Sequence, residues 1–349
     1  MSVAFYRRAL LKKLTWLPFS APLASALLSG CSQSETIPYR AQILVFGTQV
    51  DLLIFHPNQT QIDQAIAQIN QDFQKFHHEW HAWEYGGILS KINAAIAEQH
   101  PIVVADSVKA FIEKSQQLSQ QSDYLFDPGI GKLIALWGFH GENWQGPPPD
   151  QHQIEQWLAN RPSIADIEFT SNQLRSRNPQ VQLDFGGNAK GLALDMALVS
   201  LQNSGIKTAL VSIGGDMKSL GLKPNHSSWQ IAVENPSNIQ GRPIAEIPLE
   251  ADESLVTSGT YQRYFEWQGK RYSHLLNPNT GYPAQGFASV TVIHPDATTA
   301  DSAATALLIA GPKLWQKIAK QMSINFVLAI DHNGQILQTK AMASRSKLL

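Results

Sequence analysis

The sequence has a single cysteine, few charged residues and no excess of positive charge. One cysteine, Cys31, cannot form a disulfide within the chain, a zinc knuckle or an iron–sulfur site. Lys and Arg number 27 against 28 Asp and Glu, a net charge of −1, so the basic surplus that general nucleic-acid binding needs is missing. The nine Trp and fourteen Phe among 349 residues exclude disorder as the main state and predict a globular chain.

The first forty residues have the pattern of a secreted lipoprotein. Four basic residues precede residue 14, and residues 14–30 carry no charge. This run is too short, and too broken by proline, for a membrane span, but it is typical of a secretory signal. It ends in Leu28-Ser29-Gly30-Cys31, which resembles a bacterial lipobox. We therefore expect a signal peptide at 1–30, an acylated (palmitate-bearing) Cys31 and a linker at 31–40.

Removal of the signal would leave an acidic protein on a membrane surface. It deletes four of the 27 basic residues and none of the 28 acidic ones, so the remaining 319 residues carry a net charge of −5. The expected location is the periplasmic side of a bacterial membrane, held there by the lipid. Ser32 after the cysteine, in place of Asp, permits export to the outer membrane.

Helices and strands are interspersed along the rest of the chain without a strict βαβ rhythm, which predicts a mixed α/β or α+β single unit over 41–340 with a tail at 341–349. Apolar spacing predicts helices at 61–80, 107–121, 131–137, 191–203 and 299–309. Strands are predicted at 41–55 with an interruption at 46–48, and at 181–185, 209–213, 229–234, 254–257, 261–267, 270–276, 289–294, 324–330 and 336–339.

The segment from Asp184 to Gly191 is the first place where chemistry is expected. A strand would deliver the Asp184 carboxylate, the glycines would let backbone approach a ligand, and a helix would begin with free N–H groups. This arrangement suits phosphate. It is neither a Walker loop nor the dinucleotide Gly-x-Gly-x-x-Gly pattern. A tight strand–helix turn with a surface Lys190 explains the same residues equally well.

Asp301 and Thr305 are four residues apart in a predicted helix, so their oxygens share one face. With Thr299 as the cap, Asp301 falls in the first turn. The pair suits a hard cation such as Mg²⁺, although a favourable helix-dipole arrangement accounts for the same residues.

His274 follows in a strand before an Asn-Pro-x-x-Gly turn. Such a histidine is a candidate base, because it titrates near neutral pH, or a satisfied core residue.

Two further patterns are weaker. His77 and His81 share a predicted helix face, but the spacing is not His-Glu-x-x-His and no third zinc ligand is evident. Ser258 lies in Thr-Ser-Gly and lacks the Gly-x-Ser-x-Gly setting of a nucleophilic serine.

Nine segments in order resemble the ApbE family of FAD:protein FMN transferases, from about residue 41 to 340. They are Phe46-Gly47-Thr48, Leu89–Asn93, Phe126-Asp127-Pro128, Leu136–Phe139, Asp184–Gly191, Gly214-Gly215, Thr257–Gly259 with Tyr261, Ser273–Gly281, and Asp301 with Thr305. The resemblance implies an ApbE-like fold related to the T-fold, and Mg²⁺-dependent transfer of FMN from FAD to a Thr or Ser hydroxyl of an acceptor flavoprotein, with release of AMP.

The resemblance also implies roles for particular residues. The metal ligands would be Asp301, Thr305 and the Gly187 carbonyl, and His274 would be needed for transfer. The other positions that match FAD contacts are Phe46, Trp83, Leu125, Phe126, Asp127, Asp184 and Lys190. Expected acceptors are subunits of membrane redox complexes of the Nqr or Rnf type, which favours the inner membrane. Departures from the family pattern stand at Gly87, Ile88, His77, Asn188, Asn277 and Asn279.

Two other functions remain open at this point. Water in place of the acceptor hydroxyl would make the chain a Mg²⁺-dependent FAD pyrophosphatase that yields FMN and AMP. Without catalysis, it would be a periplasmic lipoprotein that binds FAD. The presence of Asp301, Thr305 and His274 together favours catalysis.

Overall fold

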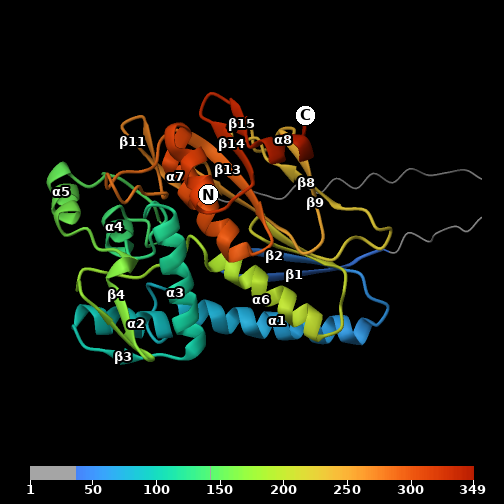
Figure 1. Cartoon of the computed structure of the whole chain (residues 1–349), viewed down its shortest axis with the longest axis horizontal. Helices are drawn as coiled ribbons and strands as arrows, with labels where there is room; N and C mark the ends of the chain where they lie inside the picture. Colours follow the sequence, from blue (N-terminus) through green and yellow to red (C-terminus); the bar gives the residue numbers. More distant parts are fainter. Residues whose placement is uncertain (1–36, 142) are drawn as a thin grey trace, which may run out of the picture. The chain divides into compact units, whose positions relative to one another are not determined.

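The computed structural model describes residues 37–141 and 143–349 (Figure 1). Its centre is an eight-stranded sheet in which every strand is antiparallel to its neighbours, in the order β1-β2-β6-β7-β10-β13-β14-β15. The predicted mixture of helices and strands in one unit is confirmed. The strands are β1 (Tyr39–Val45), β2 (Thr48–Ile54), β6 (Ala209–Ile213), β7 (Asp216–Leu220), β10 (Ser254–Gly259), β13 (Phe287–His294), β14 (Phe326–Asp331) and β15 (Ile336–Gln338).

Both faces of this sheet are covered. Helices α1 (Gln59–Trp80), α6 (Ala189–Asn203) and α7 (Ala297–Gln321) pack on one face through two apolar clusters. The other face packs on the small sheet of β8 (Trp229–Val233), β9 (Ala245–Leu249) and β16 (Lys347–Leu348), with α8 (Lys340–Arg345). Burial on two sides explains why β13 is buried at seven of its eight positions.

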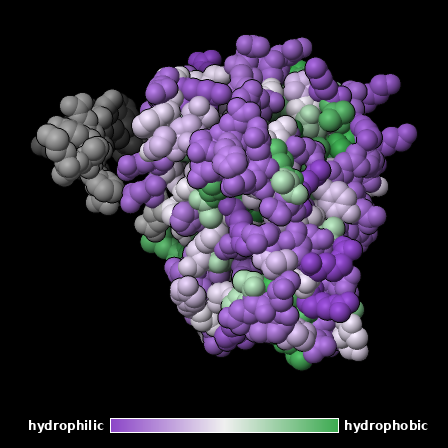
Figure 2. Space-filling view, turned by 90° about the vertical axis from the view of Figure 1, so that its left-hand side faces the viewer, coloured by the Kyte–Doolittle hydropathy of each residue, from purple (hydrophilic) through white to green (hydrophobic). Residues whose placement is uncertain are grey.

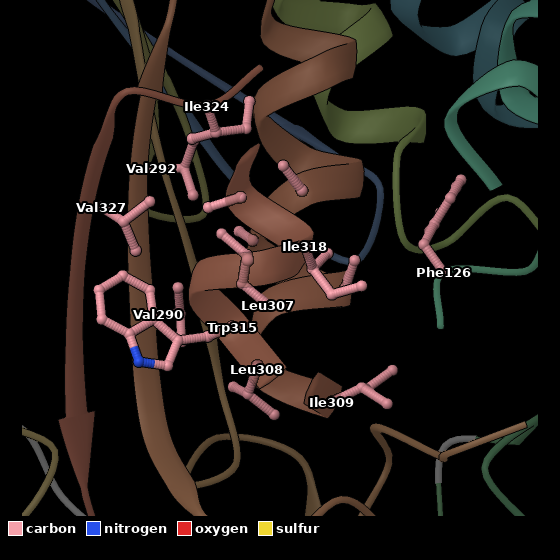
Figure 3. Close-up of a cluster of buried hydrophobic side chains, with 14 of the residues drawn as sticks. Phe126, Val290, Val292, Leu307, Leu308, Ile309, Trp315, Ile318, Ile324 and Val327 are labelled. Atoms are coloured by element: carbon pink, nitrogen blue, oxygen red, sulfur yellow. The ribbon is translucent and has the colours of Figure 1, made fainter. Parts of the chain in front are cut away.

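Helix α7 makes the largest apolar contact with the sheet. Figure 3 shows Leu307 and Ile318 of this helix opposite Val290, Val292 and Val327 of the strands, with Phe126 approaching from a separate loop. Each such fully buried side chain contributes about 1.5–3 kcal/mol. The position of α7, which carries Asp301 and Thr305, is therefore strongly determined by packing.

The remaining elements form two smaller clusters beside the sheet. One contains α2 (Ile88–Ala97), α3 (Asp106–Gln121), the short helix Ile164–Asp166 and the sheet of β3 (Ile102–Val103), β5 (Gln173–Ser176) and β4 (Ile167–Thr170). The other contains α4 (Gly131–Leu136), α5 (Gln151–Asn160) and the hairpin β11 (Tyr264–Trp267)–β12 (Lys270–Ser273). Figure 2 faces the α4, α5 and β11 side, where hydrophobic patches are small and scattered over a mainly hydrophilic surface.

The strand predicted at 181–185 is wrong. This segment makes an isolated bridge, between Ile130 and Gln182, and its backbone bonds on that side to Pro128, Gly129 and Gly131. On the other side the side chain of Asn93 takes the place of a neighbouring strand: its Nδ2 donates to the Leu183 carbonyl at 2.9 Å, and its Oδ1 accepts from the Leu183 N–H at 2.7 Å. An amide side chain that satisfies both backbone groups of Leu183 leaves no need for a second strand there.

Other boundaries differ as well. Helices α2 and α5 lie where no element was predicted. Helix α7 begins at Ala297 and is capped by Asp296, whose carboxylate accepts from the Thr299 N–H, so Thr299 is not the cap and Asp301 lies in the second turn.

The predicted tail 341–349 holds most of α8, together with β16, which pairs with β9 because the sheet edge offers free backbone groups. The predicted signal peptide, Cys31 and most of the linker lie outside the described residues. Among the residues that are described, no helix is both long and apolar enough to cross a membrane.

Candidate functional site

The start of α6 is tied directly to α7. An added side-chain carbon at Gly191 would lie 2.3 Å from the Ala297 carbonyl oxygen, so only glycine allows the two helices to approach so closely. The Gly191 N–H donates to Asp301 Oδ2 at 3.0 Å. In a regular helix this N–H would bond to the carbonyl of residue 187, four positions earlier. The Gly187 carbonyl receives no hydrogen bond within the described residues, and is therefore free for another partner.

Three predicted metal ligands come together here. Asp301 is 2% exposed and Thr305 lies one turn further along α7. Gly187 is adjacent, since a side-chain carbon built on it would be 3.7 Å from Thr305 Oγ1. Ser258 Oγ of β10 lies 3.2 Å from the same hydroxyl. Carboxylate, hydroxyl and carbonyl oxygens are the ligands that hard cations take.

Lys190 brings the positive charge of the site. Its Nζ donates to Asp216 Oδ2 and lies 3.5 Å from Asp301 Oδ1. Burial opposes the charge of Lys190, but the two carboxylates together raise its pKa. Burial also raises the pKa of Asp301 to about 7, against the effect of the Lys190 ammonium. Asp216 was missed from the sequence, although it directly follows the Gly214-Gly215 marker.

Trp83 and Asp184, which are both predicted to contact flavin, lie 101 residues apart in the sequence and form a hydrogen bond. Trp83 Nε1 donates to Asp184 Oδ2 at 2.9 Å, and the indole lies 5.2 Å from the His140 ring. Asp184 Oδ1 accepts from the Gly186 N–H at 2.8 Å. The indole is therefore held at the edge of the glycine-rich turn and remains partly exposed.

Phe46 occupies the turn between β1 and β2 with a positive φ of 60°. Its ring packs against Phe73 at 5.2 Å and His77 at 5.8 Å between centroids. The same turn lies against Gly214, where an added side-chain carbon would be 3.0 Å from Thr48 Oγ1. The turn that carries Phe46 therefore borders the turn that leads into Asp216.

Leu125, Phe126 and Asp127 follow α3 and are all buried. The Phe126 ring borders Gly187, 3.2 Å from where a side-chain carbon would stand. Asp127 is directed away from the other site residues. Its Oδ1 accepts from the N–H groups of Gly129 and Ile164, and its Oδ2 accepts from Ser163 Oγ at 2.5 Å. The described contacts of Asp127 are therefore structural.

His274 follows the end of β12. Its Nδ1 lies 3.1 Å from the Arg263 carbonyl oxygen, which can only accept, so Nδ1 carries the proton and Nε2 has a free lone pair. Burial, followed by the charge of Arg263, lowers the pKa of His274 to about 4. The imidazole is neutral at pH 7 and can accept a proton at Nε2. The charge of Lys190 also lowers the pKa of His274.

A pocket of about 480 Å³ opens beside Ser273, the residue that precedes His274. Ser273 lines it on one side, and Thr260 and Tyr261, just after β10, line it on another. Tyr272, Tyr282 and Gln285 contribute further walls. The pocket is therefore lined by residues that follow β10 and by residues of β12, whereas His274 itself is not part of its lining.

The two weaker sequence patterns are structural. His81 Nδ1 accepts from the N–H groups of Trp83 and Glu84, which consumes the lone pair that a metal would need. Within the described residues no three His, Cys, Asp or Glu side chains form a metal-binding group. The described hydrogen bond of the Ser258 side chain is to Thr305 and not to a histidine.

The departures from the family pattern have local explanations. At Gly87 an added side-chain carbon would lie 2.2 Å from the His78 carbonyl oxygen, so a serine does not fit there. Asn188 is fully buried and its Nδ2 donates to Ser115 Oγ at 2.9 Å. Asn277 Oδ1 accepts from the Asn279 N–H at 2.8 Å and closes the turn after His274.

Comparison with known proteins identifies the family. The family model described as ApbE family matches residues 46–328. The chain belongs to the ApbE family. It is 36% identical over 307 residues to the FAD:protein FMN transferase of Rhodobacter capsulatus, covering 86% of this chain and 57% of that longer protein. It is 30% identical to the enzyme of the same name from Vibrio cholerae, covering 78% and 79% of the two chains.

A solved structure of the family agrees with the fold. The ApbE protein of Thermotoga maritima superposes with a TM-score of 0.81 at 29% sequence identity, over 88% of this chain and 99% of that one. The predicted ApbE-like fold is thereby confirmed, and the site described above lies within the matched region.

Proposed function

We propose that the chain is an FAD:protein FMN transferase, which moves the FMN half of FAD to a Thr or Ser hydroxyl of an acceptor flavoprotein and releases AMP. The observation that supports it best is the convergence of Asp301, Thr305 and the free Gly187 carbonyl with Lys190, in a chain of the ApbE family. This set provides hard oxygen ligands and a positive charge at one helix start, as a pyrophosphate requires.

The oxygen ligands fit Mg²⁺. The diversion of the Gly191 N–H to Asp301 leaves the Gly187 carbonyl without a donor, and Thr305 lies next to it. Asp301, Thr305 and Gly187 would hold the ion, and a bound Mg²⁺ neutralises phosphate charge and makes the phosphorus a better electrophile.

Protein groups around the glycine-rich turn would hold the donor. Trp83 presents a partly exposed indole for stacking on the flavin, with its orientation fixed by the bond to Asp184. Lys190 supplies a cation for the phosphates, and Phe126 forms an apolar wall beside Gly187. The neighbouring Phe46 turn extends the aromatic surface.

The reaction requires a group that takes the proton from the attacking hydroxyl of the acceptor protein. The hydroxyl oxygen bonds to the FMN phosphorus, the bond from that phosphorus to the bridging oxygen breaks, and AMP leaves with the electron pair. His274 Nε2 takes the hydroxyl proton, since Nδ1–H is held by Arg263 and the ring is neutral at pH 7. The acceptor would enter through the pocket lined by Tyr261 and Ser273, the residue that precedes this histidine.

The acceptor and the location are part of the same proposal. A lipid on Cys31 would hold the enzyme at the periplasmic face, with the inner membrane favoured because redox subunits of the Nqr or Rnf type would be modified there. The acidic net charge of the chain after removal of residues 1–30 does not oppose this arrangement.

The test is the mass of the acceptor. The full chain is incubated with FAD, Mg²⁺ and a candidate acceptor domain, with and without EDTA. A metal-dependent gain of one FMN phosphoester, absent with Asp301→Ala, supports transfer. Steady release of AMP without this gain would instead identify a pyrophosphatase. No product with FAD still bound would indicate a flavin carrier and overturn the proposal.

A further inference from the structure

One ammonium group lies between two buried carboxylates at the start of α6. Asp216 and Asp301 are 3% and 2% exposed, whereas the Lys190 side chain is 35% exposed. The lysine therefore reaches the pair from the solvent side. It is the one member of the group that can move without exposing a buried charge.

The carboxylates of Asp216 and Asp301 differ in how many of their oxygens accept a hydrogen bond. Asp216 Oδ1 accepts from the Thr257 N–H at 2.9 Å, and its Oδ2 accepts from Lys190, so both oxygens are bonded. Asp301 Oδ2 accepts from the Gly191 N–H, whereas among the described residues Oδ1 has only the ammonium at 3.5 Å, an ionic contact and not a hydrogen bond. Lys190 therefore bonds to Asp216 and compensates Asp301 from a distance.

The backbone that carries Lys190 is fixed. Gly191 is packed against the Ala297 carbonyl, so α6 cannot slide along α7. Any adjustment between Lys190 and Asp301 must come from the flexible side chain of the lysine. A second cation on Asp301 would repel the ammonium, and Asp216 provides the place where the ammonium can remain.

We propose that the Lys190 ammonium competes with the metal ion for Asp301, and that Asp216 is a positioning residue that holds the ammonium off this ligand. In the metal-free protein Lys190 compensates the buried Asp301 charge. When Mg²⁺ binds, the side chain turns fully to Asp216 and stays beside the substrate phosphates. The inference rests on the proposed function, because it requires Asp301 to be a metal ligand.

The proposal predicts that substitutions of Lys190 and of Asp216, the two partners of one ion pair, change the Mg²⁺ affinity in opposite directions. In Lys190→Met the competitor is gone, and Mg²⁺ binds more tightly by about fivefold, the scale of a partly exposed ion pair. In Asp216→Asn the lysine loses its charged alternative and shifts to Asp301, so Mg²⁺ binds about fivefold more weakly. If Asp216 acts through the lysine, then adding Asp216→Asn to Lys190→Met has a smaller effect than in the wild-type background.

The measurement is Mg²⁺ affinity by isothermal titration calorimetry of the full chain without FAD. Lys114→Met is the matched control. Lys114 is also 35% exposed and pairs with Asp296, which caps α7, the helix that carries Asp301. The variant therefore removes an equal charge, but away from Asp301. Melting temperatures check that each variant folds. Lys190→Met alone decides the proposal if Asp216→Asn fails to fold.

The outcomes distinguish a failure of this inference from a failure of the proposed metal site. Tighter binding in Lys190→Met, weaker binding in Asp216→Asn and no change in Lys114→Met support the proposal. Weaker or equal binding in Lys190→Met overturns it while leaving the metal site in place. If the wild-type chain binds no Mg²⁺, the metal part of the proposed function is wrong and this inference falls with it.

Discussion

Two buried aspartates in this chain have opposite surroundings. Asp127 and Asp301 are 7% and 2% exposed, and burial raises the pKa of both, to about 6 and about 7. Asp127 is held by two backbone N–H groups and the Ser163 hydroxyl. Asp301 has one backbone N–H and a partly exposed lysine. Burial of a carboxylate therefore does not by itself mark a functional site; the partners that satisfy it do.

The difference lies in whether the partners can leave. The N–H groups around Asp127 belong to the chain turn at Gly129 and the start of the helix at Ile164, and neither can move without unfolding. The ammonium beside Asp301 can move on its own side chain. The arrangement around Asp127 joins two segments of the chain, whereas the arrangement around Asp301 keeps one carboxylate oxygen available to another cation.

Substitution of Asp301, the aspartate whose cationic partner can move, should have the greatest effect on activity. Asp301→Asn should lower FMN transfer by about 10³-fold or more, because it removes a charged ligand of the metal that activates the phosphorus. Its melting temperature should stay near that of the wild type, since the variant relieves a buried charge. Acceptor mass over time and a thermal melt check both. A large drop in stability with activity retained would assign Asp301 the structural role instead.

Substitution of Asp127, whose partners cannot move away, should show the reverse: a loss of stability. Asp127→Ala leaves three buried donors without an acceptor and should cost about 3 kcal/mol or more of folding free energy. Asp127→Asn, which keeps one acceptor oxygen, is the milder control. Because burial raises the pKa of Asp127 to about 6, its contribution to stability falls as pH rises from about 4 through 6. Chemical denaturation at pH 4.5 and 7 should show this slope in the wild type and not in Asp127→Asn.

His274 tests which residue moves the proton. His274→Ala should slow transfer by about 10²-fold. His274→Asn retains a donor for the Arg263 carbonyl but no base at Nε2, so it should be equally slow. Since the pKa of His274 is about 4, the ratio of wild-type to His274→Asn activity should be constant from pH 6 to 8 and fall only as the ring becomes protonated near pH 4. Wild-type rates in either variant would show that another group accepts the proton.

The smallest effect concerns the indole of Trp83. Trp83→Phe keeps an aromatic ring but loses the N–H that donates to Asp184, and should weaken FAD binding about fivefold, the value of one hydrogen bond. Trp144→Phe loses an equivalent N–H, to the Gly141 carbonyl on an exposed loop, and serves as the control. Equal affinities in both variants and the wild type would show that the hydrogen bond from Trp83 to Asp184 does not contribute to FAD binding.

Local patterns predicted much of the fold correctly. The helical spacing in 61–80 and 191–203 produced α1 and α6, and the glycine-threonine interruption at 46–48 became the turn between β1 and β2. The segment 181–185 is not a strand because the backbone partner of Leu183 on one side is the side chain of Asn93, which is 90 residues away. No local pattern reveals such a partner.

The spacing of neighbouring residues was enough to predict that Asp301 and Thr305 share a helix face and that a glycine-rich turn precedes α6. The folded chain was needed to bring these two features together, to add Asp216 from β7 and to turn Asp127 away. The physical reason is packing: the sheet, α6 and α7 bring together residues more than a hundred positions apart, and the distances that give them chemistry exist only after the core has formed.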